Sequence, residues 1–356
     1  MRVIAVHLLN DYSGSPKVLM QLLKGWLKND LETHLYTSGK REGFLSDIVG
    51  IQEHFYWYQF AKNPFIRLFF LTFSQMALGF KLLFFLKKTD VLYVNTVLPF
   101  GAGIVGKIRG CKVIYHIHET SMKPLLLKKF LFGIVRWSAS EVVYVSNFLA
   151  QQEPMKNKKN VLYNVLENSF VKEATQNRTA PKTTKIVLMI CSLKAYKGVH
   201  EFVTLAQMNP QFTFKLIVNA NQTEIDTYFS NETIPANLFL YPVQKNTHPF
   251  YKEASVLLNL SDVNLWVETF GLTILEGMAY GLPAIVPPVG GVVELVEEGV
   301  NGYLINSKNS IAISEKLNLI LNNDTLYQTM RLQAIEKSKH FTEEYFEDES
   351  IRILSN

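Results

Sequence analysis

Cysteine, targeting signals and metal-binding patterns are scarce or missing in this sequence of 356 residues. The chain has two cysteines, Cys111 and Cys191, and both sit among strand-like residues. This pattern predicts buried free thiols and excludes a disulfide framework or a zinc site. The apolar run at residues 1–9 is too short for a signal peptide and has no small-residue cleavage site. We therefore expect a cytoplasmic protein from a reducing compartment.

No uninterrupted apolar run reaches the ~20 residues that a membrane-spanning helix needs. The nearest candidate is the Phe- and Leu-rich stretch Phe65–Leu86, in which Arg67 and Lys81 leave an uncharged run of only Leu68–Phe80. Two interpretations of this stretch stay open. It is either a core helix of the first domain or a helix that docks on the membrane interface.

Acidic residues are scarce in the first half of the chain. Residues 1–170 hold 21 Lys/Arg and 11 Asp/Glu, a net charge of +10, whereas residues 171–356 hold 15 and 20, a net charge of −5. A basic half indicates an anionic partner, and no DNA- or RNA-binding motif points to nucleic acid. The segment Pro124–Trp137 mixes basic with Leu, Phe and Trp side chains. This composition favours peripheral contact with an anionic membrane surface on its inner, cytoplasmic face.

Length and pattern predict an α/β protein with two Rossmann-like domains that face a central cleft. Strand-like and helix-like runs alternate, which is typical of parallel sheets covered by helices. The polar segment 171–185 interrupts the pattern and is interpreted as the linker. We expect an N-terminal domain over 1–170, a C-terminal domain over 171–340, and an amphipathic helix over 341–356. The expected strands are Val3–Leu9, Thr33–Thr37, Val91–Val94, Val113–His118, Val142–Val145, Ile186–Cys191, Phe212–Val218, Leu238–Tyr241, Val256–Leu260 and Ala284–Pro287.

The strongest chemical pattern is a pair of glutamates, Glu268 and Glu276, eight positions apart around a glycine. If a helix begins near Gly271, Glu268 lies on the loop before it and Glu276 lies inside it. Gly271 lets the backbone approach a ligand closely, and the amides of Gly271, Leu272 and Thr273 become unpaired donors at a helix N-terminus. Such an N-terminus is a site for a diphosphate. Glu276 is then placed for ribose hydroxyls and Glu268 for a sugar.

The segment Ser261–Ile305 resembles a known family. It reads Glu-Thr-Phe-Gly-Leu-Thr-Ile-Leu-Glu-Gly-Met-Ala-Tyr-Gly-Leu-Pro from Glu268, followed by Pro-Val-Gly-Gly-x-x-Glu ending at Glu294. This is similar, almost residue for residue, to the Glu-x7-Glu region of the retaining glycosyltransferases with the GT-B fold, family 4. Weaker similarity covers nearly the whole chain. It implies that the N-terminal domain binds the acceptor, that the C-terminal domain binds the nucleotide sugar, and that the helix over 341–356 crosses back to the first domain. The resemblance implies a UDP-sugar or GDP-sugar as donor substrate, Phe270 among the donor-binding residues, and catalysis without metal or cofactor.

A basic loop follows the first strand of the second half. In the family this loop presents cations to the donor diphosphate, and Lys197 beside Gly198 has the right place to neutralise charge on the leaving group. The family usually has Arg where this chain has Ser192, and Lys194 is a candidate replacement. The resemblance thus assigns Ser192 and Lys197 to donor binding, and Lys197 also to catalysis.

Two loops of the first half carry the remaining candidates. Gly14 lies between a strand and a helix and resembles the family's glycine loop near the donor phosphates or the acceptor, although a plain turn explains it equally well. Alternation places His116 and His118 on one face of a strand end. The resemblance implies that His118, followed by Glu119, reaches hydroxyl groups of the donor sugar, with His116 as a structural neighbour. Ser146 and Asn164 are interpreted as structural residues.

The sequence therefore predicts a retaining glycosyltransferase. The expected partners are a nucleotide-sugar donor, a sugar or lipid-linked acceptor from surface polysaccharide synthesis, and an anionic membrane surface. Lys197 and the amides near Gly271 stabilise the leaving diphosphate, and Glu268 orients the sugar. Two alternatives remain: a hydrolase or epimerase of nucleotide sugars on the same fold, and a relative that binds donor without chemistry. Only Ser192, in place of the usual Arg, supports the second.

Overall fold

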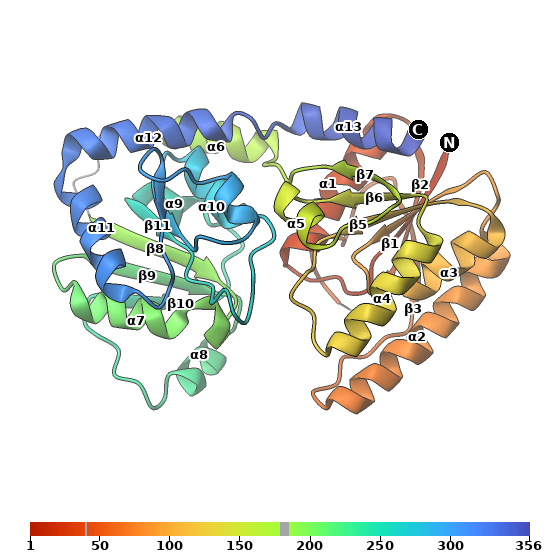
Figure 1. The fold of residues 1–356 in the computed structure, drawn as a ribbon, viewed down its shortest axis with the longest axis horizontal. Helices are drawn as coiled ribbons and strands as arrows, with labels where there is room; N and C mark the ends of the chain where they lie inside the picture. Colours follow the sequence, from red (N-terminus) through yellow and green to blue (C-terminus); the bar gives the residue numbers. More distant parts are fainter. Residues whose placement is uncertain (40, 179–184) are drawn as a thin grey trace. The chain divides into compact units, whose positions relative to one another are not determined.

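The chain forms two compact α/β units. The computed structural model describes residues 1–39, 41–178 and 185–356. One unit contains Met1–Asn164 and Glu344–Asn356, and the other contains Val165–Glu343. Each unit has one parallel sheet flanked by helices, so the predicted fold class is confirmed (Figure 1). Part of the segment predicted as the linker forms helix α6 (Asn168–Asn177), and its residues 179–184 lie outside the described residues.

The N-terminal unit is built on a seven-stranded sheet with the order β3-β2-β1-β4-β5-β6-β7. Its strands are β1 (Arg2–Val6), β2 (Glu32–Ser38), β3 (Gln52–Tyr56), β4 (Val91–Asn95), β5 (Lys112–Ile117), β6 (Glu141–Tyr144) and β7 (Lys158–Val161). The central strands are buried on both faces, which explains their nearly continuous apolar sequences. The strand order reverses between β1 and β4, so the loops after these two strands diverge and leave room for a ligand.

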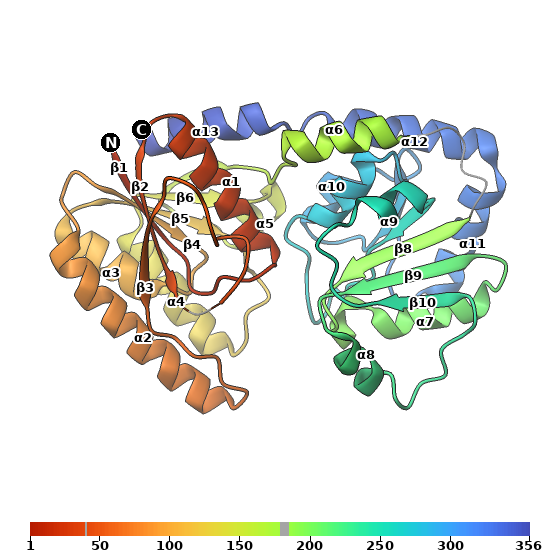
Figure 2. The same ribbon diagram turned by 180° about the vertical axis from the view of Figure 1, so that it is seen from behind.

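Helices cover both faces of this sheet. They are α1 (Gly14–Lys28), α2 (Pro64–Phe85), α3 (Phe100–Arg109), α4 (Leu125–Ser138), α5 (Asn147–Gln152) and the C-terminal α13 (Glu343–Ser355). Helix α3 packs between α2 and α4, and the three lie side by side in both views (Figures 1 and 2). Helix α13 packs against α1, where the indole of Trp26 donates to the hydroxyl of Ser350 at 3.1 Å.

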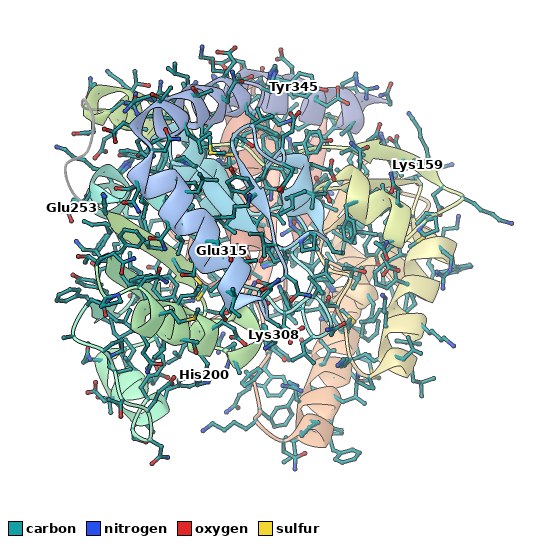
Figure 3. The ribbon with its side chains drawn as sticks, turned by 60° about the vertical axis from the view of Figure 1, so that its left-hand side comes forward. Lys159, His200, Glu253, Lys308, Glu315 and Tyr345 are labelled. Carbon is teal, nitrogen blue, oxygen red and sulfur yellow. The ribbon has the colours of Figure 1, made fainter. Side chains whose placement is uncertain are left out.

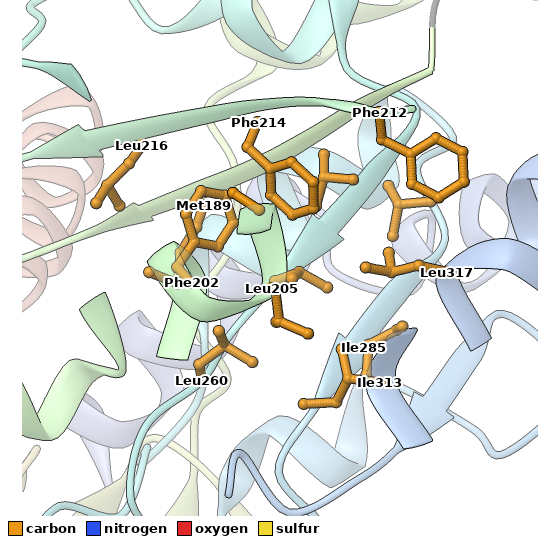
Figure 4. Close-up of a cluster of buried hydrophobic side chains, with 14 of the residues drawn as sticks. Met189, Phe202, Leu205, Phe212, Phe214, Leu216, Leu260, Ile285, Ile313 and Leu317 are labelled. Carbon is orange, nitrogen blue, oxygen red and sulfur yellow. The ribbon is translucent and has the colours of Figure 1, made fainter. Parts of the chain in front are cut away.

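The C-terminal unit has a six-stranded sheet with the order β10-β9-β8-β11-β12-β13. Its strands are β8 (Ile186–Cys191), β9 (Thr213–Val218), β10 (Leu238–Tyr241), β11 (Val256–Leu258), β12 (Ala284–Val286) and β13 (Gly302–Leu304). Its helices are α6, α7 (Val199–Met208), α8 (Gln222–Tyr228), α9 (His248–Glu253), α10 (Leu272–Ala279), α11 (Ser310–Asn322) and α12 (Asp324–Ser338), with short 3-10 turns over Ala195–Lys197 and Gly291–Glu294. Side chains of β8, β9, α7 and α11 interlock in its core (Figure 4).

Three edge strands, β3, β7 and the three-residue β13, were not predicted from the sequence. Strand β3 reads Gln-Glu-His-Phe-Tyr and β7 reads Lys-Lys-Asn-Val, and most of their residues are exposed or half-buried. Polar edge strands show no apolar run because only one side of their backbone pairs with the sheet. The first strand also ends at Val6 rather than at the predicted Leu9, since the chain turns there into the loop before α1.

Candidate active site

An ion pair lies beyond the carboxyl end of the C-terminal sheet. Lys197 ends the 3-10 turn that follows β8, and Glu268 lies on the loop before α10. The ammonium Nζ of Lys197 is 2.8 Å from Oε2 of Glu268, and the side chains are only 14% and 21% exposed. Asn259, just after β11, approaches the same carboxylate oxygen at 3.5 Å. The structure therefore brings together the two residues that the sequence analysis assigned to catalysis in this domain.

The surroundings of Glu268 keep its carboxyl ionised. Burial alone raises the pKa of Glu268, but the charge and hydrogen bond of Lys197, with a hydrogen bond from Asn259, outweigh burial and lower the pKa below its ordinary value. The pair is neutral as a whole, which makes it tolerable in a largely desolvated place. An incoming diphosphate would meet a cation that is already oriented and only partly hydrated.

An aromatic pair flanks the ion pair. The rings of Tyr196 and Trp266 stack with centroids 5.3 Å apart, and Nζ of Lys197 lies 5.0 Å from the centroid of Trp266. Cation–π attraction of this kind orients the lysine side chain without neutralising it. The carbonyl of Tyr196 accepts from the amide of Asp262 at 2.8 Å, and Lys308, a surface residue, pairs with Asp262 at 3.4 Å (Figure 3). Neither ring was predicted from the sequence to belong to the site. Tyr196 directly precedes Lys197, and Trp266 lies two positions before Glu268.

The N-terminus of α10 presents free backbone donors beside Glu268. Gly271 caps the helix with a φ of +105°, a conformation that favours glycine. The amides of Leu272 and Thr273 make no hydrogen bond to any other part of the described chain. Phe270 is buried, and the centroids of its ring and that of Phe341 are 5.7 Å apart. Free amides at a helix N-terminus are donors suited to an anion, and the binding of a diphosphate here stays a prediction.

Two glycines hold the backbone of Glu268 in place. The amide of Gly291 donates to the carbonyl of Glu268 at 2.7 Å. Gly290 has a φ of +120°, and a Cβ added there would lie 2.5 Å from that same carbonyl oxygen. Glycine is thus required at 290 both by its conformation and by its close approach. The sequence analysis quoted this glycine pair as part of the family motif but gave it no role.

Glu276 is buried one turn inside α10. Its Oε2 accepts a hydrogen bond of 2.6 Å from the hydroxyl of Tyr251, which comes from α9. Burial, and then the Glu276 carboxylate, raise the pKa of Tyr251 well above 10, so the phenol stays a donor at neutral pH. Tyr251 therefore positions Glu276. That Glu276 binds ribose hydroxyls stays a prediction.

Tyr251→Phe should lower the free energy of unfolding by about 1.5–3 kcal/mol, because it removes a hydrogen bond to a buried charged group. Tyr327→Phe is the matched control. Its buried hydroxyl has no hydrogen-bond partner among the described residues, so its removal should change stability by less than about 0.5 kcal/mol. Urea unfolding of both variants measures the difference, and equal stabilities would contradict the positioning role of Tyr251.

Three histidines gather at the carboxyl ends of β1, β4 and β5 in the N-terminal unit. Nε2 of His118 donates to Oδ1 of Asn95 at 2.9 Å, and Nδ2 of Asn95 donates to Nδ1 of His7 at 3.0 Å. His116 is hydrogen-bonded through Nδ1 to the hydroxyl of Tyr93 at 2.9 Å, and its ring lies 4.3 Å from that of His118. His116 is thus the structural neighbour that was predicted. Asn95 was missed, and a polar residue ending the buried run Val-Leu-Tyr-Val was the available signal.

The three histidines of this cluster are uncharged at pH 7. Burial lowers the pKa of His7 to about 4 and that of His116 to about 3. Burial, and then the neighbouring His116 and His7, lower the pKa of His118 well below its ordinary value. Burial raises the pKa of the adjacent Glu119 to about 7, so this carboxyl gains or loses a proton near physiological pH. Titratable groups with shifted pKa values at strand ends are typical of functional sites.

Backbone strain marks the same place. Thr96 follows Asn95 with a φ of +71°, in the left-handed region that a β-branched residue rarely adopts. Its amide donates to the carbonyl of His116 at 2.8 Å. Such strain costs on the order of 1–3 kcal/mol and persists where the surrounding structure requires it.

The histidines should make the protein less stable as the pH falls from about 6.5 to 4. An unfolded histidine binds its proton near pH 6.5, whereas folded His7 binds it only near pH 4, so the unfolded state carries more protons in this window. Glu119 has the opposite effect on stability as the pH falls, because its pKa in the folded state lies above the unfolded value of about 4.3. His7→Leu removes one titrating group, so the drop in Tm between pH 7 and pH 5 should be smaller in this variant than in the wild type. The same drop in both proteins would exclude the effect.

The remaining predicted residues have simpler settings. Gly14 is exposed at the first position of α1. Ser192 is half-buried directly after β8, and Lys194 is exposed and makes no ion pair with the described residues, so it does not reach Glu268. Ser146 caps α5 by accepting from the amide of Leu149 at 3.1 Å, which agrees with its structural interpretation. Gly14 and His118 belong to the N-terminal unit, and the other site residues belong to the C-terminal unit.

The two cysteines form no disulfide. Both are free, Cys111 is buried and Cys191 is half-buried. Burial raises the pKa of Cys191 to about 12, so its thiol is unreactive at neutral pH. Across residues 1–39, 41–178 and 185–356, no group of three or more His, Cys, Asp and Glu side chains is arranged to hold a metal ion.

Comparisons with known proteins agree with this architecture. Residues 171–340 match the family model described as Glycosyl transferases group 1, and residues 12–152 match that of Glycosyltransferase Family 4. N-acetyl-alpha-D-glucosaminyl L-malate synthase of Bacillus anthracis is 24% identical over 285 residues, covering 74% of this chain and 73% of that one. An uncharacterized glycosyltransferase of Methanocaldococcus jannaschii is 26% identical over 261 residues, covering 70% and 71%.

Solved structures share the fold across the whole chain. HepE of Anabaena in complex with UDP-glucose has a TM-score of 0.80 at 19% identity, covering 100% of this chain and 99% of that one. TarM of S. aureus in complex with Fondaparinux, alpha-GlcNAc-glycerol and UDP has a TM-score of 0.77 at 11% identity, covering 100% of both chains. At these identities the likeness concerns the fold alone.

Two Rossmann-like units of seven and six parallel strands, with a glutamate-rich site at the helix α10 N-terminus, define the GT-B class of glycosyltransferases. The chain belongs to family 4 of these enzymes, the glycosyl transferases group 1, as the sequence motif indicated. As a member of this family it is a retaining glycosyltransferase that uses a nucleotide-diphosphate sugar as donor.

Proposed function

We propose that this enzyme transfers a sugar from a UDP-sugar to a lipid-linked or oligosaccharide intermediate of surface polysaccharide synthesis. The ion pair between Lys197 and Glu268, beside the free amides of α10, carries the proposal of donor binding. UDP as the nucleotide is supported by the complexes of HepE with UDP-glucose and of TarM with UDP. The lipid-linked acceptor is supported by the basic character of residues 1–170, with their net charge of +10.

The proposed reaction breaks the bond between the anomeric carbon and the β-phosphate oxygen of the donor. The acceptor hydroxyl forms the new bond to that carbon on the same face, and its proton passes to the departing diphosphate. Negative charge therefore builds on the diphosphate in the transition state. Lys197 and the amides of Leu272 and Thr273 stabilise this charge, and they are preorganised before the donor arrives.

The carboxylates have separate proposed roles. Glu268 accepts hydrogen bonds from hydroxyl groups of the donor sugar and holds the anomeric carbon within reach of the acceptor hydroxyl, on the face that the diphosphate leaves. Glu276, fixed by Tyr251, accepts from the ribose hydroxyls. His118, a neutral donor and acceptor in the N-terminal unit, is proposed to bind sugar hydroxyl groups.

A thermal-shift screen with UDP- and GDP-sugars tests donor binding. A ligand that binds only the folded state raises Tm, and the increase grows with the logarithm of ligand concentration above its Kd. A UDP-sugar should stabilise the wild type and the control Glu315→Ala equally, because Glu315 is exposed on α11 (Figure 3). It should stabilise Glu276→Ala much less.

Other outcomes would change the assignment. Stabilisation by GDP-sugars alone would replace uridine with guanosine as the base. Equal stabilisation of wild type and Glu276→Ala would exclude this glutamate from the donor site. Rapid consumption of donor without any acceptor would favour hydrolysis, and binding with no turnover on any acceptor would favour a binding protein.

A further inference from the structure

Helix α2 is apolar on two opposite faces. One face is buried and consists of Leu71, Ser74, Gln75, Leu78, Gly79 and Leu82. The other is exposed and consists of Phe65, Phe69, Phe73, Met76, Phe80 and Phe84, whose exposed fractions run from 54% to 83%. At 100° per residue these six side chains fall within an arc of about 100°, and the stripe is about 28 Å long. Contiguous apolar surface of this size marks an interaction site.

The buried face fixes α2 to the rest of the N-terminal unit. Oε1 of Gln75 accepts from the amide of Gly101 at 3.2 Å, and a Cβ added at Gly101 would lie 2.3 Å from the carbonyl of Gln75. Gly79 similarly approaches Val105. By length and composition α2 is the one described helix that could cross a membrane. Its close packing on α3 makes it a helix that lies along a surface instead.

A second stripe lies on α4, on the other side of α3. Leu126, Phe130 and Trp137 follow one another at helical spacing and are 80%, 52% and 55% exposed. The buried residues of α4 lie on its opposite face, so this stripe also points away from the sheet. Helices α2, α3 and α4 lie side by side in Figures 1 and 2. We call their outer side the α2–α4 face. The exposed ring of Trp57 contacts Phe73 in an edge-to-face arrangement, with ring centroids 5.7 Å apart.

The charge of the α2–α4 face is mainly positive. Residues 54–140 hold 12 Lys/Arg and two acids, Asp90 and Glu119, and one exposed acid from β3, Glu53, lies beside Phe80 and Lys81. Asp90 is buried and paired with Arg2 at 2.6 Å, and burial raises the pKa of Glu119 to about 7. The exposed basic residues are Lys62, Lys81, Lys87, Lys88, Lys107, Arg109, Lys123, Lys129 and Arg136. A second copy of the chain would bring two basic faces together, whereas an anionic lipid surface complements them.

We propose that the α2–α4 face docks the N-terminal unit on an anionic lipid bilayer. The aromatic stripes enter the boundary between headgroups and acyl chains, with α2 lying in the plane of the membrane. The basic side chains lie among the lipid phosphates, and Trp57 and Trp137 sit at the polar interface. The inference does not depend on which donor the C-terminal unit binds.

Flotation of the full chain with phosphatidylcholine vesicles, with and without phosphatidylglycerol, tests the proposal. The wild type should float with the anionic vesicles, and added salt should weaken its binding. Phe69→Glu/Phe80→Glu should reduce the bound fraction at least about tenfold, since it places charge in the apolar boundary. The matched control Ile311→Glu/Leu332→Glu changes two exposed apolar residues of the C-terminal unit and should bind like the wild type.

Three results would overturn the proposal. The first is a wild type that does not float with anionic vesicles at low salt. The second is equal binding of the two double variants. The third is a wild-type dimer in solution that Phe69→Glu/Phe80→Glu converts to a monomer, which would make the face an interface between copies. The thermal shift with UDP-sugars should be the same in all of these proteins. Its loss in every one would count against the proposed donor, not against docking.

Discussion

Lys197→Ala should lower kcat about a hundredfold to a thousandfold, the usual effect of removing one preorganised charge stabiliser. The lysine is the cation next to the proposed diphosphate position and is oriented by both Glu268 and Trp266. Steady-state kinetics on the donor identified by the screen measures the change. Lys252→Ala is the control, because Lys252 is exposed and makes no ion pair within the described parts of this unit. Loss of activity in both variants, or in neither, would contradict the role of Lys197.

The same variant should shift the pH dependence of turnover. Lys197 lowers the pKa of Glu268, and burial alone would raise it. In Lys197→Ala the residual activity should therefore decline at a higher pH than in the wild type as Glu268 becomes protonated. An unchanged acidic limb of the pH profile would show that the ionised form of Glu268 is not required.

Gly290→Ala should destabilise the protein by about 2–4 kcal/mol and reduce activity about a hundredfold. Its φ of +120° strains any side-chain-bearing residue, and its Cβ would collide with the carbonyl of Glu268. The collision displaces Glu268, and a misplacement of about 1 Å is enough for a large loss of rate. Chemical unfolding and donor turnover measure the two effects.

Gly299→Ala separates strain from collision. Gly299 also has a positive φ, +74°, but a Cβ added there would have no atom within 4 Å. This control should cost only about 1 kcal/mol and leave turnover unchanged. Similar losses of activity in both variants would mean that contact with Glu268 is not what Gly290 protects.

The sequence predicted the fold because both sheets are buried on two faces. Apolar runs such as Ile186–Cys191 and Val91–Val94 coincide with β8 and β4. The edge strands β3 and β7 could not be predicted, since their residues are half in water and carry no apolar run. The sequence alone could not decide whether α2 is a core helix or a helix on the membrane interface. Only the structure shows that one of its apolar faces is buried and the other is exposed.

The candidate site was predictable where its chemistry is local. Glu268, Gly271 and Glu276 fall within nine residues of one motif, and the structure places them at one helix end. The residues that position them were missed because they come from distant parts of the chain. Tyr251 is 25 positions from Glu276, and Asn95 is 23 positions from His118. Contacts of this kind depend on strand order, which a single sequence does not specify.

The most direct test of the account is the anomeric form of the sugar that the enzyme releases from a UDP-α-sugar. Proton NMR in the first minutes distinguishes the α- from the β-anomer before they interconvert, and slow transfer to water makes the measurement possible without the natural acceptor. The account predicts that the wild type releases the α-anomer and that Lys197→Ala releases almost none. Release of the β-anomer, or turnover that does not need Lys197, would contradict retaining transfer at this site.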